Sequence, residues 1–229
     1  MSMAQEIAER VQHVLAQIEA IRPGEGVKLM AVTKMRTREE ALAAVAAGAQ
    51  LIGENKVQEA KDKWHEKPPV PLHLIGHLQT NKVKYTIDLF DSVDSIDSEK
   101  VAEALNQRVT DRLAVMLEIN AGQEASKTGM FPQHVRAFLE QAHRWPHLQF
   151  IGMMALFPSA VGTTLDEKKK IRALMKETGE LWRTCREERF PWAPLDELSM
   201  GMTDDYEWAL EAGTTIVRLG TALFGPRTY

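Results

Sequence analysis

Strand-like segments alternate with helical segments along nearly the whole chain, and this alternation restricts the fold more than any other feature. The strand candidates lie at 27–34, 50–55, 72–76, 90–95, 113–120, 148–156, 197–200 and 215–220. Helical patterns separate most of them, notably at 37–48, 98–109, 132–144, 165–188 and 203–212. Strands that alternate with helices pair in parallel and are joined by right-handed crossovers. The pattern therefore predicts an α/β protein.

Eight such units in a chain of 229 residues fit a closed (β/α)8 TIM-type barrel. An extra N-terminal helix is predicted at 4–21, because its apolar residues fall on one face. They are Ile7, Val11, Val14, Ile18 and Ile21. An open doubly wound sheet is the alternative, but no GxGxxG pattern follows the first strand. No linker rich in Pro, Gly or Ser divides the chain, so we expect a single domain over residues 1–229.

The composition excludes several classes of protein. A net charge of −4 with scattered Lys and Arg argues against nucleic-acid binding, which needs a basic face. No apolar stretch reaches the length of a membrane span, and the N-terminus has no signal-peptide core. Cys185 is the only cysteine, so an internal disulfide is impossible. We expect a soluble, cytoplasmic monomer that binds neither nucleic acid nor membrane.

Ligands of such barrels bind at the carboxyl ends of the strands, so the residues there are candidates for the site. Lys34 ends the first strand candidate, Asn55 ends the second, and Arg218 lies near the end of the eighth. A lysine at the end of a strand is usually solvated, and a buried arginine is often paired with a carboxylate. Neither residue alone establishes a binding site.

The ends of the last two strands resemble a phosphate site, which barrels usually build from these loops. The segment SMGMTDD supplies the hydroxyl of Ser199 and the flexible backbone of Gly201, and Thr203 is a candidate N-cap of the next helix. The segment RLGTALFG supplies Gly220 and the hydroxyl of Thr221. Each pattern alone is typical of an ordinary turn. Two of them at these two strand ends favour phosphate binding.

A lysine facing a phosphate site suits a phosphorylated aldehyde that is held as an imine. Pyridoxal 5′-phosphate (PLP) is the commonest ligand of this kind, and its ring nitrogen needs a partner such as Asp or Arg. Arg218 lies two residues before Gly220, so its side chain can reach a ring whose phosphate is held there. On spacing alone, this hypothesis and a solvated Lys34 remain open alternatives.

Several long motifs resemble the pyridoxal-phosphate homeostasis protein family. They are LMAVTK at 29–34, GENKVQEA at 53–60, HLIGHLQTNK at 73–82, EASKTGM at 124–130 and LSMGMTDDYEWALEAGTTIVRLGTALFG at 198–225. The resemblance implies a fold-type III barrel like the N-terminal domain of alanine racemase. It also implies that Lys34 forms the internal aldimine and that Arg218 faces the pyridine nitrogen.

The resemblance further implies that Ser199, Gly201, Gly220 and Thr221 hold the phosphate and that Asn55 lies beside the ring. The one visible departure is Thr203, where we expect a serine.

Three functions are compatible with these residues. The first is a protein that holds PLP as a reversible aldimine for intracellular PLP homeostasis, without catalysis, and delivers it to PLP-dependent apo-enzymes. The second is a racemase-like PLP enzyme, which needs an acid–base group on the opposite face of the imine. In alanine racemases a second domain supplies that group, and we expect no such domain here. The third is a Schiff-base aldolase, which would have no visible chromophore.

Overall fold

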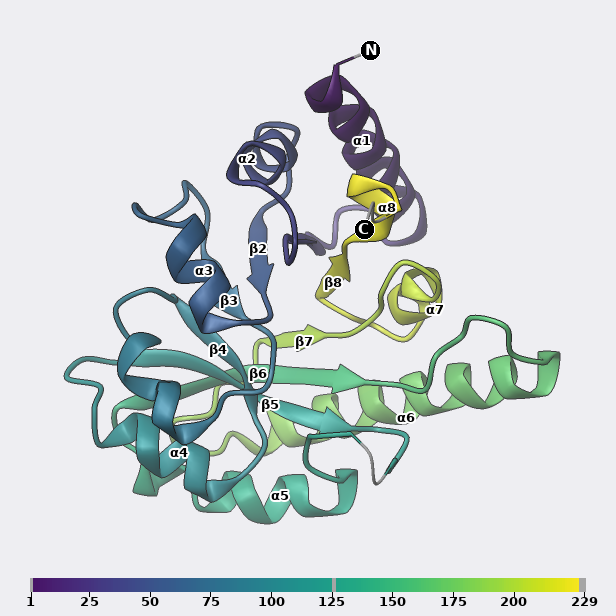
Figure 1. Ribbon diagram of the computed structural model, residues 1–229. Helices are drawn as coiled ribbons and strands as arrows, with labels where there is room; N and C mark the ends of the chain where they lie inside the picture. Colours follow the sequence, from purple (N-terminus) through teal and green to yellow (C-terminus); the bar gives the residue numbers. More distant parts are fainter. Residues whose placement is uncertain (1, 125–126, 227–229) are drawn as a thin grey trace.

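Eight parallel strands close into a barrel in the computed structural model, which describes residues 2–124 and 127–226 (Figure 1). The strands are β1 (Lys28–Val32), β2 (Leu51–Glu54), β3 (Leu72–Leu74), β4 (Ser92–Ile96), β5 (Leu113–Asn120), β6 (Leu148–Leu156), β7 (Glu197–Ser199) and β8 (Ile216–Leu219). They follow one another around the barrel in chain order, and β8 pairs with β1. The predicted (β/α)8 TIM-type barrel is confirmed.

Helices connect the strands and cover the outside of the barrel (Figure 1). The α-helices are α1 (Met3–Ile21), α2 (Arg38–Ala46), α3 (Val57–Lys63), α4 (Glu99–Asn106), α5 (Pro132–Glu140), α6 (Leu165–Glu188), α7 (Tyr206–Glu211) and α8 (Thr221–Phe224). Two 3-10 helices, η1 (Thr80–Tyr85) and η2 (Ala142–Arg144), complete the set. Residues 125 and 126 of the EASKTGM segment lie outside the described residues.

The predicted extra helix, α1, covers the seam where the barrel closes. It begins with a capping box in which Ser2 and Gln5 bond each other's backbone N–H groups. Its apolar face packs against the outer faces of β1 and β8 and against α8, which lies beside it in Figure 1. This cluster contains Ile7, Val11, Val14, Ile18, Leu29, Ala31, Val217, Leu219 and Leu223. The first helix therefore holds the first and last strands together.

Side chains fill one end of the barrel and leave the other end open. Met30, Leu51 and Ile216 form a buried cluster, with Ile75 packed against it. Gly53 makes room for this packing, since a Cβ there would lie 2.7 Å from the sulfur of Met30. The remaining space lies beyond this layer, at the carboxyl ends of the strands.

Several predicted boundaries next to that space shift by one or two residues in the structure, and two of these shifts concern Lys34 and Thr203. Strand β1 ends at Val32, not at Lys34, because the chain turns at once and the Arg36 N–H donates to the Thr33 carbonyl at 3.0 Å. Helix α7 is capped at Asp205, not at Thr203. The Asp205 carboxylate accepts the Met202 N–H at 2.7 Å, which closes a turn before the helix begins.

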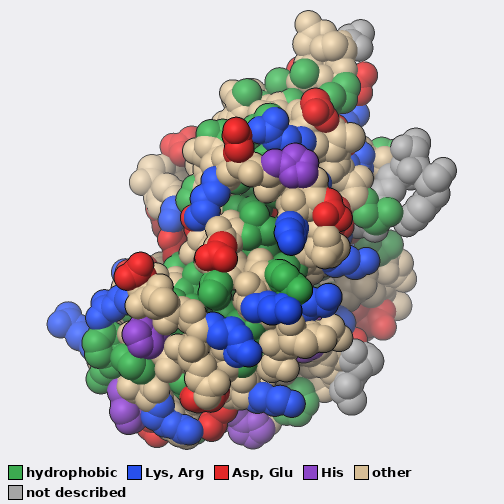
Figure 2. All heavy atoms as spheres, turned by 60° about the vertical axis from the view of Figure 1, so that its left-hand side comes forward, with side chains coloured by type: hydrophobic (Ala, Val, Ile, Leu, Met, Phe, Trp, Pro, Cys, Tyr) green, Lys and Arg blue, Asp and Glu red, His purple; other side chains and the backbone are tan. Residues whose placement is uncertain are grey.

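The described residues contain no helix that is both long and apolar enough to cross a membrane. On the face shown in Figure 2, Lys and Arg side chains lie among Asp, Glu and His side chains over the whole surface. Charge on this face is therefore mixed in sign.

Because α1 covers the seam, we expect two of its isoleucines to contribute differently to the free energy of unfolding. Ile7 is 2% exposed, whereas Ile21 at the end of the helix is only partly buried. We expect Ile7→Ala to lower the free energy of unfolding by about 2–5 kcal/mol, because it leaves a cavity between α1 and the barrel. Ile21→Ala should cost less than half as much. Urea denaturation followed by circular dichroism measures both, and equal losses would contradict a closing role for α1.

Candidate functional site

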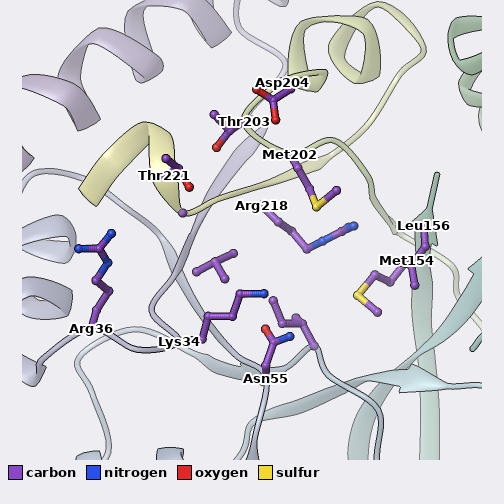
Figure 3. A pocket seen from close by; sticks show the side chains of 13 residues that line it. Lys34, Arg36, Asn55, Met154, Leu156, Met202, Thr203, Asp204, Arg218 and Thr221 are labelled. Atoms are coloured by element: carbon purple, nitrogen blue, oxygen red, sulfur yellow. The ribbon is translucent and has the colours of Figure 1, made fainter. Parts of the chain in front are cut away.

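A cavity of about 310 Å³ opens at the carboxyl ends of the strands (Figure 3). Its walls come from the ends of β1, β2, β3, β6 and β8 and from the loops after β7 and β8. The lining residues are Val32, Lys34, Arg36, Asn55, Ile75, Met154, Leu156, Met202, Thr203, Asp204, Arg218, Gly220 and Thr221. The volume lies within the range of about 300–1,000 Å³ that is usual for small-molecule sites.

Lys34 and Asn55 form one side of this cavity. Lys34 lies in the turn after β1, and its half-buried side chain extends into the cavity beside Asn55 (Figure 3). The Oδ1 atom of Asn55 is buried and has no hydrogen-bond partner within the part of the chain that the structure describes. A buried acceptor of this kind normally has a partner. A ligand that donates a hydrogen bond would satisfy it.

Arg218 forms the opposite side, and its guanidinium is held by two neighbours. Nη1 donates to the hydroxyl of Ser199 at 2.8 Å, and Nη2 donates to the carbonyl of Ala155 at 2.9 Å. Burial lowers its pKa to about 10, although Asp94, Asp205 and Glu118 favour the charged form. Arg218 therefore remains a cation and a hydrogen-bond donor at neutral pH.

Burial also raises the pKa of the Glu118 and Asp205 carboxyl groups. Glu118 accepts a hydrogen bond from the Thr128 hydroxyl, and Arg218 contributes a smaller effect that favours its charged form. The guanidinium is thus the positive centre of a largely buried group of acids.

Ser199 and Gly201, two of the predicted phosphate residues, do not line the cavity. The Ser199 hydroxyl is fully buried and accepts the hydrogen bond from Arg218. Gly201 has a φ of +92°, and a Cβ there would lie 2.7 Å from the Cβ of Ala209. Glycine is therefore required for the loop to pack on α7. Ser199 thus contacts Arg218 and Gly201 lets the loop pack, while their expected contact with a phosphate stays a prediction.

The hydroxyl-bearing residues Thr203 and Thr221 both line the part of the cavity that carries Gly220. Thr203 accepts the backbone N–H of Ala222 at 3.2 Å, which ties the loop after β7 to the start of α8. Thr221 begins α8 and is exposed to the cavity (Figure 3). A Cβ at Gly220 would make only ordinary contact with Val32, 3.5 Å away. The protein itself does not require glycine there, so the missing side chain leaves space for a ligand.

Sequence reasoning did not assign Thr203 and Arg36 to the site. The sequence pattern predicts that Thr203 caps a helix, although Thr203 lies in the loop directly after Ser199. Arg36 follows Lys34 by two residues, and its Nη2 donates to the Gly225 carbonyl at 2.7 Å. Its guanidinium also lies over the Phe224 ring. A basic residue so close to the candidate lysine was the available signal.

Neighbouring residues differ in whether they line the cavity. Met154 lines the cavity, whereas Met153 is buried in the large core cluster outside it. His77 is 46% exposed and its Nδ1 lies 3.2 Å from Asp97 Oδ2, away from the cavity wall. No group of three or more His, Cys, Asp or Glu residues suitable for a metal ion occurs in residues 2–124 and 127–226.

The sequence of this chain matches a known protein family. The family described as "Alanine racemase, N-terminal domain" matches residues 8–228. The pyridoxal phosphate homeostasis protein of Pasteurella multocida is 36% identical, over 98% of this chain and 96% of its own length. The chain belongs to the pyridoxal phosphate homeostasis protein family. The family resemblance seen in the sequence motifs is confirmed.

Solved structures of other proteins agree with this assignment. PipY of Synechococcus elongatus with PLP bound has a TM-score of 0.80 and 32% identity, and the match covers 96% of this chain and all (100%) of PipY. Alanine racemase of Corynebacterium glutamicum has a TM-score of 0.75 at 17% identity, and the match covers 98% of this chain and 62% of the racemase. The second similarity concerns the fold alone.

Because the hydroxyl of Ser199 is buried and Thr221 is exposed, we expect their removal to change stability by different amounts. Ser199→Ala leaves a buried N–H of Arg218 without its acceptor, which we expect to cost about 1–3 kcal/mol of unfolding free energy. Thr221→Ala changes an exposed side chain and should alter it by less than about 0.5 kcal/mol. Urea unfolding without added ligand measures both. A stability of Ser199→Ala equal to that of the unsubstituted protein would contradict the supporting role of Ser199.

Proposed function

We propose that this protein binds PLP through Lys34 and serves in intracellular PLP homeostasis. The observation that carries the proposal is that Lys34, Arg218 and two threonines, Thr203 and Thr221, line one cavity of suitable size. An amine, a fixed cation and a hydroxyl-lined wall correspond to the aldehyde, ring nitrogen and phosphate of PLP. The names of the relatives and the bound PLP of PipY support the same ligand.

Each group of the ligand has a candidate partner. Thr203 and Thr221 would donate hydroxyl hydrogen bonds to the phosphate, in the space left by Gly220. The orphaned Oδ1 of Asn55 would accept a hydrogen bond from a protonated group beside the aldehyde. Arg218 would donate to the ring nitrogen, with its guanidinium fixed by Ser199 and Ala155. The role of Ser199 in this proposal is therefore to orient Arg218.

The covalent step belongs to Lys34. Lys34 would hold the aldehyde, because a neutral lysine amine condenses reversibly with an aldehyde and releases one water molecule. Water reverses the reaction, so the protein can store the aldehyde and release it to PLP-dependent apo-enzymes.

We propose the cytoplasm as the location and the monomer as the working form. Cys185 is compatible with that setting, because burial raises the pKa of its thiol to about 11 and keeps it unreactive.

A binding role fits the cavity better than racemisation. When bound, PLP supplies an electron sink. The ring is a weaker sink when its nitrogen accepts a hydrogen bond from a guanidinium cation and therefore stays unprotonated. The ionisable residues among the described lining are Lys34, Arg36, Asp204 and Arg218. Arg36 is engaged with Gly225, and Asp204 lies beside Thr203 on the proposed phosphate side (Figure 3). Arg218 lies opposite Lys34 but is a cation fixed by Ser199 and Ala155, so none of the four serves as the second acid–base group that racemisation through two bases requires.

Lys34 is expected to be the site of attachment. After addition of PLP and reduction with borohydride, a phosphopyridoxyl group should be found by peptide mapping on Lys34, and Lys34→Ala should lose it while remaining folded. Lys82→Ala is the control and should keep the label, because Lys82 lies in η1 rather than on the cavity wall. A label mainly on Lys82 or Lys127 would overturn the assignment, and an unlabelled protein would refute covalent PLP binding.

The phosphate wall is tested with two ligands that differ only in the phosphate. Hydrogen bonds to charged groups contribute about 1.5–3 kcal/mol each. The Thr203→Ala/Thr221→Ala protein should therefore bind PLP at least about 100-fold more weakly and bind pyridoxal as before. The Thr203→Ser/Thr221→Ser protein keeps both hydroxyls and should bind both ligands normally. Spectroscopic titration measures the affinities, and equal weakening for PLP and pyridoxal would show that the hydroxyls support only the fold.

A further inference from the structure

A buried carboxylate lies directly behind the wall that carries Lys34 and Asn55. Glu54, the residue before Asn55, is fully buried on the outer side of the barrel, where α3 packs against β2 (Figure 1). Its Oε1 atom accepts from the Thr33 hydroxyl at 2.6 Å, from Lys63 Nζ at 2.8 Å and from Trp64 Nε1 at 3.4 Å. Residues that directly precede Lys34 and Asn55 are thus bonded to each other.

Lys63 joins this carboxylate to both neighbours of Lys34. The Lys63 side chain is 8% exposed, and its Nζ donates to the Thr33 carbonyl at 2.6 Å. The same Nζ lies 3.5 Å from Oε1 of Glu59. Glu59 in turn accepts the backbone N–H of Met35. One ammonium group therefore holds the residue before Lys34 directly and the residue after it through Glu59.

The backbone at Met35 is in a conformation that needs such support. Its φ is +59°, and its side chain lies on the surface, since Met35 is 62% exposed. A left-handed conformation is unfavourable for a non-glycine residue and persists where the surroundings impose it. The contact from Glu59 to the Met35 N–H is one such constraint, and it fixes the turn from which the Lys34 side chain departs.

Stability alone is a poor explanation of this arrangement. A buried ion pair contributes little net stability, because both charges lose their hydration. Here the second oxygen of Glu54 is also buried without a partner among the described residues, which adds to the cost. The contacts of Lys63 instead involve the neighbours of the two cavity residues. Thr33 and Glu54 directly precede Lys34 and Asn55, and Glu59 bonds the residue after Lys34.

We propose that Lys63 is a positioning residue, which aims the Lys34 amine into the cavity by fixing the backbone on both sides of it. The inference rests on the proposed function, because it assigns Lys63 to imine formation by Lys34. It does not assign Lys63 to the binding of the phosphate or the ring. Loss of Lys63 should therefore affect ligands that react with Lys34 and spare those that only occupy the cavity.

Pyridoxamine 5′-phosphate separates these effects, because it carries the ring and the phosphate but no aldehyde. In Lys63→Met, we expect imine formation with PLP, followed by its absorption, to be about 10–100-fold slower, as for other misplaced reacting groups. Affinity for pyridoxamine 5′-phosphate, followed by its fluorescence, should stay within about twofold. Lys61→Met in the same helix is the matched control, because Lys61 is exposed, and it should behave as the unsubstituted protein.

A second pair of variants tests the same idea without a buried substitution. Glu59→Ala removes the acceptor of the Met35 N–H, whereas Glu59→Gln retains an oxygen at that place. Glu59→Ala should slow imine formation, and Glu59→Gln should restore most of the rate. This pair decides the question if Lys63→Met does not fold, which circular dichroism would show.

Each remaining outcome has a definite meaning. Equal weakening of PLP and pyridoxamine 5′-phosphate in the variants would show that Lys63 supports only the structure and would overturn the inference. Normal imine formation in both Lys63→Met and Glu59→Ala would overturn it as well. If the unsubstituted protein forms no imine with PLP, the proposed function itself fails and the inference fails with it.

Discussion

Parallel pairing of the first strand with the last is the constraint on which the rest of this structure depends. The register sets Met30 beside Arg218 and Ala31 beside Leu219, so residues from opposite ends of the barrel sequence become neighbours. The same register brings the turn after β1 close to the loop after β8. Lys34 and the wall at Gly220 therefore share a cavity only because the barrel is closed.

A second constraint is the charge inside the barrel. Arg218 is buried, and the acids that favour its charged form come from β4, β5 and the loop before α7. Asp94 is among them, and it also bonds His73 at 2.8 Å and the Ser92 hydroxyl at 2.6 Å. Burial has the largest single effect on His73 and opposes its protonation, but the attraction and hydrogen bond of Asp94, together with Asp91 and Glu197, outweigh it and raise the pKa of His73. The barrel therefore holds buried polar and charged groups in addition to its apolar layer.

The sequence was sufficient for the fold and for part of the cavity. Alternation gives the barrel, and the rule that ligands bind at strand ends gives Lys34, Asn55, Arg218, Gly220 and Thr221, all of which line the cavity. The rule places a residue at a strand end but does not give the direction of its side chain.

This limit explains the different positions of Ser199 and Thr203. The short strand β7 directs Ser199 toward Arg218, and the side chain of Asp205 sets the turn that carries Thr203 to the cavity. The bonds among Thr33, Glu54 and Lys63 depend on the rotation of the short helix α3, which its seven residues do not reveal by periodicity.

The closed seam has one more consequence, for the order of events during synthesis. The ribosome releases β1 long before β8, so the lysine exists well ahead of the arginine and the glycine that complete its cavity. A nascent chain that lacks β8 cannot hold a ligand between these groups, and ligand binding becomes a report of complete folding. By mass action the ligand also favours the closed barrel over its open precursors.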